Sequence, residues 1–518
     1  MQNPTNAFTP VDQKLLKAFH AVVVDKKLVI QEGIPALPSY VNEWLIRRFF
    51  HNGVTTEARQ RMRSFVERYL PPQNKKEEIK ARLRALGSYK LIDQFSVTVD
   101  LRRNRFHLHV PSLDIRDANI DETIVEQHTM LLSGGVWGAG RLLYKEDSNT
   151  GEMDVFMDQF EPIQISSFDI DLFIEKRATF TIEEWIDVLV LSQGLNPWAY
   201  PKFEKKLLLI TRLLPMVQAN LNMVELAPKG TGKTHVYKNI SYYSHVISGG
   251  TITAPQLFYN LGDKTAGLLV TNDVVVFDEI QTITFDKPGV ITGILKDYME
   301  SGSYARGPKK ASARASVVMQ GNIQMTEANE PLHPIWFREL PRPLQETALI
   351  SRLHIFLPGW FLPKISVSDV ALAQSYGLAA DYLSEALHTL RDRYECDRYI
   401  NRRVKVTGTE DIRDEKAVRR TAAGFLRLLF PHLIVTDKEL RQYCIDPAIR
   451  YRQYVRNQLH LMDEEFPDFK LNYELHGLET PLPEEDETEM AEKNDDFVEL
   501  AHELASNTSR DNLGQDYD

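Results

Sequence analysis

Residues 222–234 read Asn222-Met-Val-Glu-Leu-Ala-Pro-Lys-Gly-Thr-Gly-Lys-Thr234, a short apolar run followed by a glycine-containing turn. The turn departs from the pattern G-x-x-x-x-G-K-[ST] only at its first position, where Ala227 replaces glycine. A methyl group is tolerable there if the residue keeps a negative φ, whereas Gly230 and Gly232 permit close approach of a phosphate. The stretch therefore predicts a strand, a phosphate-binding loop and the start of a helix.

This loop predicts an ATP-binding site. In a loop of this kind the lysine, Lys233, reaches the β- and γ-phosphates, and the hydroxyl of Thr234 ligates Mg²⁺. A chance glycine-rich turn is the alternative interpretation of so short a motif. The residues expected to bind ATP are Ala227, Pro228, Lys229, Gly230, Thr231, Gly232, Lys233 and Thr234.

A second motif supports the first. Asp273-Val-Val-Val-Phe-Asp-Glu279 is an apolar strand that ends in two carboxylates, and Asp278 follows Lys233 by 45 residues. Such a strand would deliver Asp278 to the magnesium ion and Glu279 to the attacking water, beside the phosphate-binding loop. A solvated acidic turn is common in isolation, but the two motifs in this order favour a site that hydrolyses ATP.

The surrounding pattern predicts an α/β fold, a P-loop ATPase core of the AAA+ class built on a parallel sheet. Residues 222–358 alternate short apolar strands with helices, as a parallel sheet requires. Helical periodicity returns after Pro358 and predicts a helical lid over the nucleotide. The expected core strands are 222–226, 245–248, 274–278, 316–320 and 353–357.

Before this core the sequence predicts an α+β region. Residues 11–92 mostly show helical periodicity, and short alternating segments between 95 and 174 favour a small β-barrel or β-sandwich. We therefore expect five parts. They are an N-terminal helical region (1–92), a small β-rich domain with a trailing helix (93–200), the ATPase core (201–360), the helical lid (361–475) and an acidic, disordered tail (476–518).

The composition is that of a soluble globular protein, with 43% hydrophobic and 26% charged residues. No apolar run approaches the roughly 18 residues that a membrane span needs, and the N-terminus lacks a signal-peptide pattern. The two cysteines, Cys396 and Cys444, exclude a disulfide scaffold and a cysteine-based zinc ribbon. We expect a cytoplasmic protein.

The net charge of −11 is unevenly distributed. Residues 481–518 contain 13 acidic residues, one lysine and one arginine, which accounts for the net charge of the whole chain. The rest of the chain is neutral, so the overall charge does not argue against a local basic surface that binds DNA. The low apolar content of the acidic segment predicts disorder.

One segment contains basic residues but no acidic ones. No acidic residue occurs from Ser301 to Thr326, and the loop contains a Gly307-Pro308 turn. The loop precedes the strand 316–320, so we expect it to project as a hairpin. In a ring, this position faces the central pore. Lysines there would contact DNA phosphates independently of the base sequence. A solvated basic turn is the alternative. The residues expected to bind DNA are Arg306, Lys309, Lys310 and Arg314.

The region from about Leu221 to Phe430 closely resembles BrxL, the family of Lon-related AAA+ proteins found in bacterial BREX phage-defence systems. The family usually has glycine where this chain has Ala227, and Val-Ala where it has Ile280-Gln281. Residues 11–200 are compatible with the family but match less specifically. The matching phrases are Val224–Lys238, Ile247–Gly250, Leu257–Asn260, Lys296–Met299, Leu357–Trp360 and Ala417–Thr421.

Among AAA+ enzymes the same core looks like minichromosome maintenance helicases. Met299–Asn322 resembles their presensor hairpin, Ser351–Leu353 their arginine-finger motif, and Val418-Arg419 their second sensor, whereas the insert Tyr259–Leu269 is shorter than theirs. The resemblance implies a DNA-binding ring, hexameric or doubled, whose N-terminal domain forms a collar. It also implies a role in stopping incoming phage DNA.

The AAA+ resemblance assigns further residues to the site. Asn322 stands where these proteins carry the sensor that orients the attacking water, although a simple Gly-Asn turn would look the same. Arg352 precedes the last core strand and is expected to stabilise charge on the γ-phosphate of a neighbouring subunit. Its competitors are Arg338 and Arg342, and an ordinary surface arginine is the alternative. Arg419 is expected to be the second sensor, with Arg420 as its rival.

Together these features predict an ATPase that requires ATP and Mg²⁺. It would form a homo-oligomeric ring that binds or encircles DNA and translocates on it or remodels it in antiphage defence. One alternative is a protein unfoldase, which should have an aromatic pore loop, whereas only Tyr304 lies near the basic turn. Another is an ATP-gated scaffold that clamps DNA and recruits other defence proteins.

Long family members add a Lon-like protease domain with a Ser–Lys dyad. Only the acidic tail follows the lid here, so we expect no protease activity.

Overall fold

The computed structural model describes residues 9–477, apart from short gaps at 35–36, 52, 71–72, 101–104, 133–134, 147–150, 164, 166–167, 262–264, 307–308 and 366–369. Nearly all of the predicted acidic tail, 476–518, therefore lies outside the described residues. Within the described part of the chain, no helix has both the length and the apolar character needed to cross a membrane.

A five-stranded parallel sheet is the centre of the larger part of the molecule. Its spatial order is β15-β7-β14-β11-β8, so the strand that leads into the phosphate-binding loop, β7, lies inside the sheet. All neighbouring strands are parallel, which confirms the predicted α/β sheet and its five core strands. The strands are β7 (Met223–Ala227), β8 (Ser244–Ile252), β11 (Val274–Phe285), β14 (Ser316–Asn322) and β15 (Ile355–Pro358).

Both faces of this sheet are buried, which is why its strands read as continuous apolar runs. Alternate residues enter different hydrophobic cores: Val274 and Val276 pack on one side, and Val275 and Phe277 on the other. All four side chains are fully buried. The helices between the strands include α11 (Lys233–Asn239), α12 (Ala254–Leu257), α13 (Leu268–Thr271), α14 (Pro288–Ser301) and α15 (Thr347–Ile350).

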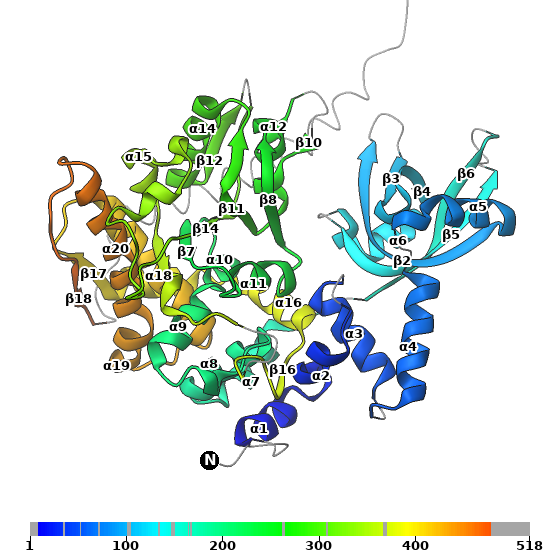
Figure 1. Cartoon of the computed structure of the whole chain (residues 1–518), viewed down its shortest axis with the longest axis horizontal. Helices are drawn as coiled ribbons and strands as arrows, with labels where there is room; N and C mark the ends of the chain where they lie inside the picture. Colours follow the sequence, from blue (N-terminus) through cyan, green and yellow to red (C-terminus); the bar gives the residue numbers. More distant parts are fainter. Residues whose placement is uncertain are drawn as a thin grey trace, which may run out of the picture.

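The chain after the sheet is mainly helical. Most of these helices pack into the core on one face of the sheet, and the last long helix also enters the core on the other face through Val455 and Leu459. Two of these helices, α16 and α18, pack against α10, which precedes β7 (Figure 1). A π-helical turn, Leu440–Ile445, leads directly into the last long helix. The elements are α9 (Phe203–Thr211), α10 (Leu214–Val217), α16 (Ala380–Leu390), α17 (Glu395–Arg403), β17 (Val404–Thr407), α18 (Ile412–Leu429), α19 (Asp437–Glu439), α20 (Asp446–Met462) and β18 (Asn472–Leu475).

The N-terminal β-rich part is a closed five-stranded barrel in the order β2-β3-β4-β6-β5. Neighbouring strands are antiparallel except β4 and β6, and α6 (Glu122–Gln127) lies between β4 and β5 along the chain. This arrangement matches a five-stranded Greek-key barrel of the OB type. The strands are β2 (Ser88–Asp100), β3 (Arg105–Val110), β4 (Ile115–Ile120), β5 (Val136–Glu146) and β6 (Met153–Pro162).

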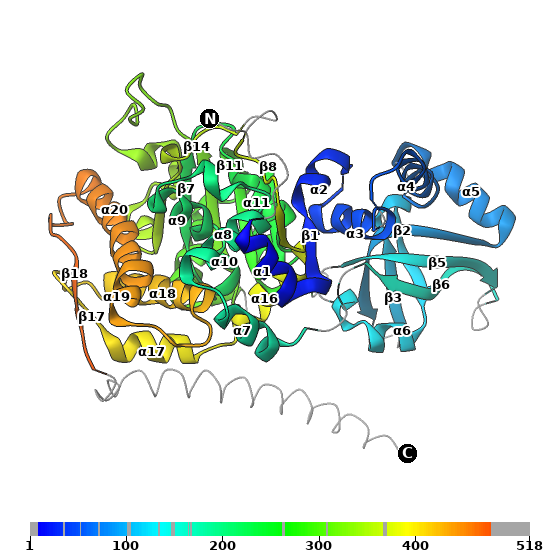
Figure 2. The ribbon, with the colours of Figure 1, turned by 90° about the horizontal axis from the view of Figure 1, so that it is seen from below.

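The barrel projects from one side of the sheet and its helices, and α3 lies between the two parts in both views (Figures 1 and 2). Two apolar residues of α3, Tyr40 and Val41, pack with Ile92 and Ala139 of the barrel and with Ala380 of α16. The linking helices are α2 (Lys26–Glu32), α3 (Ser39–Phe49), α4 (Thr56–Tyr69) and α5 (Lys76–Leu86).

Helices from the N-terminal region and from the segment after the barrel pack with the C-terminal helices. Leu15 and Phe19 of α1 (Pro10–Phe19) share the core of the C-terminal helices, as do Phe173 of α7 (Ile170–Ala178) and Trp185 of α8 (Ile182–Ser192). A short strand near the N-terminus, β1 (Val23–Asp25), pairs with β16 (Tyr376–Leu378). Periodicity identifies such helices in the sequence but does not say which core they enter.

Candidate active site

The phosphate-binding loop begins where β7 ends. Gly230 and Gly232 have φ values of 87° and 74°, in the left-handed region that residues with a Cβ atom avoid. Ala227 is the last, extended residue of β7, so it meets the expected condition of negative φ. The absence of a side chain at Gly359 leaves room for the methyl group of Ala227. A Cβ atom on Gly359 would lie only 2.5 Å from the Cβ atom of Ala227.

A buried ion pair contacts the phosphate-binding loop. Arg212 of the α9–α10 segment and Glu225 of β7 are both fully buried, and their closest nitrogen and oxygen atoms lie 2.6 Å apart. Arg212 also donates a hydrogen bond of 3.1 Å to the carbonyl oxygen of Thr231, inside the loop. The sequence carries a signal for this pair that motif analysis missed: a charged residue inside a buried apolar run needs a partner.

The side chain of Lys233 opens α11 and reaches across to β14. Its ammonium group donates a hydrogen bond of 2.9 Å to the Oδ1 atom of Asn322. Burial lowers the pKa of Lys233, while the charges of Glu225 and Asp278 act in the opposite direction. The structure thus brings the loop lysine and the proposed sensor residue together at the carboxyl edge of the sheet.

Thr234 and Asp278 form the candidate magnesium site. The hydroxyl of Thr234 donates a hydrogen bond of 3.0 Å to Oδ1 of Asp278, and Asp278 is buried. The hydroxyl of Ser248 on β8 lies 3.4 Å from the other carboxylate oxygen. One carboxylate and one hydroxyl fit Mg²⁺, which is held in nucleotide sites by few protein oxygens together with phosphates and water.

Glu279 directly follows this aspartate and has an unusual backbone. Its φ of 48° places a residue other than glycine in the left-handed region, and its side chain is exposed. The backbone N–H of Glu279 donates to Oδ1 of Asp278, and its carbonyl accepts a hydrogen bond from the Thr282 hydroxyl. Such strained positions are concentrated at functional sites. The turn therefore presents the Glu279 carboxylate beside the buried Asp278.

Gln281 is a further residue of the site that sequence reasoning did not select. Its side-chain amide donates a hydrogen bond of 2.6 Å to the Asn322 carbonyl and accepts one of 3.3 Å from the Asn322 N–H. This two-point contact fixes the backbone of Asn322 next to Lys233. The only signal in the sequence was the departure from the family at Ile280-Gln281, which by itself did not indicate a contact.

Arg352 lies at the opposite edge of the sheet from the phosphate-binding loop. It precedes the amino end of β15, and all strands are parallel, so the length of a strand separates it from the carboxyl edge. For the five residues of β7 that length is about 15 Å. Its competitors Arg338 and Arg342 lie in exposed short turns before α15. Arg352 therefore faces away from the nucleotide site of its own chain.

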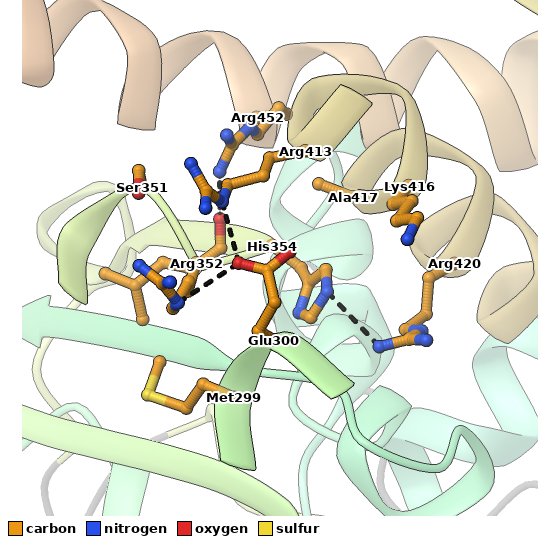
Figure 3. Close-up of a pocket in the computed structure, with 11 residues that line it drawn as sticks. Met299, Glu300, Ser351, Arg352, His354, Arg413, Lys416, Ala417, Arg420 and Arg452 are labelled. Atoms are coloured by element: carbon orange, nitrogen blue, oxygen red, sulfur yellow. Dashed lines mark hydrogen bonds and ion pairs between the residues drawn. The ribbon is translucent and has the colours of Figure 1, made fainter. Parts of the chain in front are cut away.

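The structure separates the two candidates for the second sensor, which are neighbours on α18. Arg420 lines a pocket together with Arg352 (Figure 3) and donates a hydrogen bond of 3.0 Å to the carbonyl of Asn220. Arg419 is directed elsewhere: it donates to the Val404 carbonyl and pairs with Glu415 at 2.8 Å. The geometry places Arg420, rather than Arg419, in the pocket that contains Arg352.

The predicted basic hairpin is present. It consists of β12 (Ser303–Arg306) and β13 (Lys309–Ser312), paired antiparallel. The Gly307-Pro308 turn and the side chains of Arg306 and Lys309 lie outside the described residues, and Lys310 is exposed. Arg314 is at the base of the hairpin, where it pairs with Asp392 at 2.8 Å and lies over the ring of Tyr394. It is thus separated from the tip.

The model of the family "Lon-like protease BrxL-like, ATPase domain" matches residues 155–472. This segment includes the phosphate-binding loop, Asp278, Glu279, Asn322 and Arg352. The chain belongs to the BrxL family. A second BrxL model, "BREX system Lon protease-like protein BrxL N-terminal", matches residues 17–144.

Two curated relatives show the same relationship along most of the chain. "Lon-like protease BrxL" of Escherichia coli O9:H4 (strain HS) is 34% identical over 471 residues, which cover 89% of this chain and 67% of the relative. The protein of the same name from Bacillus cereus (strain H3081.97) is 33% identical over 478 residues, or 89% of this chain and 68% of the relative. The chain thus spans about two thirds of the length of these BrxL proteins and carries the ATPase domain of the family.

Proposed function

We propose that this BrxL-family chain is an AAA+ ATPase that assembles into a ring, engages DNA and uses ATP hydrolysis to translocate on it or remodel it. The proposed setting is antiphage defence of the BREX type, in the cytoplasm, with other defence proteins as partners. The relatives are named Lon-like proteases; the proposal for this chain rests on its ATPase domain and includes no peptide hydrolysis.

The observation that carries the proposal is the pair of contacts at the carboxyl edge of the sheet. Lys233 bonded to Asn322 and Thr234 bonded to Asp278 lie at one edge, with Glu279 following Asp278. These residue types, so placed, bind a nucleoside triphosphate and its metal and orient a water molecule.

Each side chain has a defined task in this mechanism. The loop N–H groups and Lys233 would bind the β- and γ-phosphates, and Asn322 would exchange its contact with Lys233 for one with the phosphate or water. Mg²⁺ held by Thr234 and Asp278 would neutralise phosphate charge. The Glu279 carboxylate would orient the attacking water, because its exposed position lies next to the metal-binding aspartate.

A ring explains why Arg352 lies at the wrong edge for its own nucleotide. Head-to-tail contacts close a ring by placing one edge of each subunit against the opposite edge of the next. Arg352 would then approach the γ-phosphate bound by a neighbour. The helices after β15 would act as a lid, since the N–H of Ile365, which leads into them, donates a hydrogen bond of 2.8 Å to the carbonyl of Gly230 in the loop.

The hairpin β12–β13 supports DNA rather than an unfolded protein as the substrate. An unfoldase requires an exposed aromatic residue in the pore, but Tyr304 is buried and its hydroxyl donates a hydrogen bond to the carbonyl of Phe258. The residues nearest the turn are basic, as phosphate contacts require. A DNA clamp that hydrolyses ATP slowly is the second candidate, because the same surfaces would serve it.

The test is DNA binding by a Lys309→Ala/Lys310→Ala variant across a salt titration on two unrelated duplexes. Each lost phosphate contact should reduce the log–log salt slope by about one unit. Affinity should fall equally for both sequences, since phosphate contacts carry no base information. Basal ATP hydrolysis should persist, whereas its stimulation by DNA should fall. A motor also requires ATP-dependent movement on DNA, which a clamp would lack.

The matched control is Lys405→Ala/Lys438→Ala, which removes two exposed lysines from the C-terminal helical part. It should leave the slope unchanged. If the hairpin variant and this control bind DNA alike, the hairpin is an ordinary solvated turn and does not contact DNA.

A further inference from the structure

The pocket around Arg352 combines many cations with a single acid. Four basic side chains meet there, from the α15–β15 segment and from one face of α18 (Figure 3). Among the described residues that line the pocket, Glu300 at the end of α14 is the only carboxylate. The basic side chains are Arg352, Arg413, Lys416 and Arg420; a fifth, Arg452, is neutralised by the buried Asp414 at 2.7 Å.

Glu300 joins two of these cations. Its Oε2 atom accepts a hydrogen bond of 2.7 Å from Nε of Arg413 and lies 3.1 Å from Nε of Arg352. Two guanidinium groups repel each other unless an anion lies between them. Glu300 reduces that repulsion, so Arg352 and Arg413 can share one side of the pocket.

The bridge leaves a particular part of each arginine available. Both contacts with Glu300 use the inner Nε atom, and Arg352 also donates from Nη1 to the Ala348 carbonyl. The Arg413 side chain makes no other hydrogen bond or ion pair to a described residue, so its two terminal nitrogens are available. These are the atoms that form forked contacts with phosphate oxygens. Side-chain exposures of 16% for Arg352 and 37% for Arg413 leave both accessible to a ligand.

The charge balance of the pocket favours a multiply charged anion. Four cations around one carboxylate leave an excess of positive charge that a terminal phosphate would compensate. Burial lowers the pKa of the Arg352 guanidinium, and the nearby Arg413 charge adds to this, whereas Glu300 and Asp297 oppose it. An arriving phosphate would therefore relieve a repulsion that Glu300 only partly cancels.

We propose that Glu300 is a positioning residue that ties Arg352 and Arg413 into a two-arginine receptor for the terminal phosphate of a nucleotide bound by the neighbouring subunit. Arg413 contacts the phosphate directly, and Arg420 and Lys416 extend the positive surface. This inference rests on the proposed ring, because the pocket lies at the sheet edge opposite the phosphate-binding loop of the same chain.

The test is complementation between variants in mixed rings. Arg413→Ala damages the receptor side of an interface and Glu279→Gln the nucleotide side, so a one-to-one mixture leaves about a quarter of head-to-tail interfaces intact. ATP hydrolysis should recover in that mixture, as it should for Glu300→Gln mixed with Glu279→Gln. A mixture of Arg413→Ala with Arg352→Ala should not recover, because both changes damage the same side.

Two further measurements separate positioning from a general structural role. Arg413→Ala should lower kcat by about 100-fold, the usual effect of losing one donor to a developing charge, and Glu300→Gln by roughly 10- to 100-fold through misplacement. Binding of a fluorescent ATP analogue to the loop should stay at the wild-type level in both. Glu300→Asp should recover part of kcat, because it retains the charge. Arg450→Ala, an exposed arginine of α20, is the control and should hydrolyse ATP normally.

The outcomes distinguish this inference from the proposed function. If Arg352→Ala mixed with Glu279→Gln fails to recover, the ring with a trans-acting arginine is wrong. If that mixture recovers but Arg413→Ala alone has wild-type kcat, or Arg413→Ala recovers when mixed with Arg352→Ala, only the two-arginine receptor is wrong. Arg413→Ala changes a partly exposed side chain, so it tests the receptor even if Glu300→Gln does not assemble.

Discussion

The ion pair between Arg212 and Glu225 yields a prediction that separates stability from nucleotide binding. Both side chains are fully buried, and Arg212 forms hydrogen bonds to both carboxylate oxygens of Glu225 and to the carbonyl of Thr231. Replacing Arg212 by Met retains much of the volume but leaves the Glu225 carboxylate buried without its cation. Breaking a buried pair in this way costs about 3–5 kcal/mol.

The double variant Arg212→Met/Glu225→Leu should behave differently. Replacing a whole buried pair by apolar residues is often neutral or stabilising, so most of the lost stability should return. The hydrogen bond to Thr231 stays absent in the double variant, and this carbonyl lies within the phosphate-binding loop. We therefore expect a double variant with nearly normal stability that still binds ATP more weakly than the wild type.

Calorimetric unfolding and titration with an ATP analogue measure the two effects separately. A loss of 3–5 kcal/mol corresponds to a fall in Tm of about 10 °C for a domain of this size. The double variant should regain most of that fall and keep a raised Kd. A single variant that melts within about 2 °C of the wild type would refute the stabilising role of the pair. A double variant with wild-type Kd would refute the anchoring of the loop by Arg212.

Two further substitutions test contacts beside the loop. Gln281→Ala should lower kcat by up to about 100-fold with little change in ATP affinity, because Asn322 loses the two-point contact that fixes it; steady-state kinetics that match the wild type would contradict this. Gly359→Ala would place a Cβ atom 2.5 Å from that of Ala227 and should cost about 1–3 kcal/mol. Adding Ala227→Gly should restore only part of the lost Tm, since the methyl group that Gly359→Ala adds would also lie 2.9 Å from the Glu225 carboxylate. If the Tm change of the double variant equals the sum of the two single changes, the contact between the two positions is absent.

Local motifs were sufficient to predict the parallel sheet and the position of the loop. The apolar runs before Lys233 and Asp278 become buried strands whose polar ends meet at one edge, because parallel strands impose that arrangement. Residues that act through distant contacts were not predicted. Arg212 and Gln281 are matched to their partners only by the folded chain.

The arginines of α18 show what sequence can and cannot decide. Arg413, Lys416 and Arg420 follow the spacing i, i+3, i+7 and share one face of the helix, whereas Arg419 falls on another. The sequence shows that spacing, but which face of α18 meets Arg352 depends on how α18 packs against α10 and α20. Similarly, helical periodicity over residues 11–92 did not show that α1 enters the core of the C-terminal helices, as α8 also does.

The central claim is that the edge of the sheet at Lys233, Thr234 and Asp278 hydrolyses ATP with Glu279 orienting the water. Single-turnover hydrolysis by Glu279→Gln, measured beside equilibrium binding of Mg²⁺-ATP, tests it most directly. The account predicts binding close to that of the wild type with hydrolysis slower by about 100-fold or more, while Lys233→Ala should lose binding itself. Hydrolysis by Glu279→Gln at the wild-type rate would contradict the account.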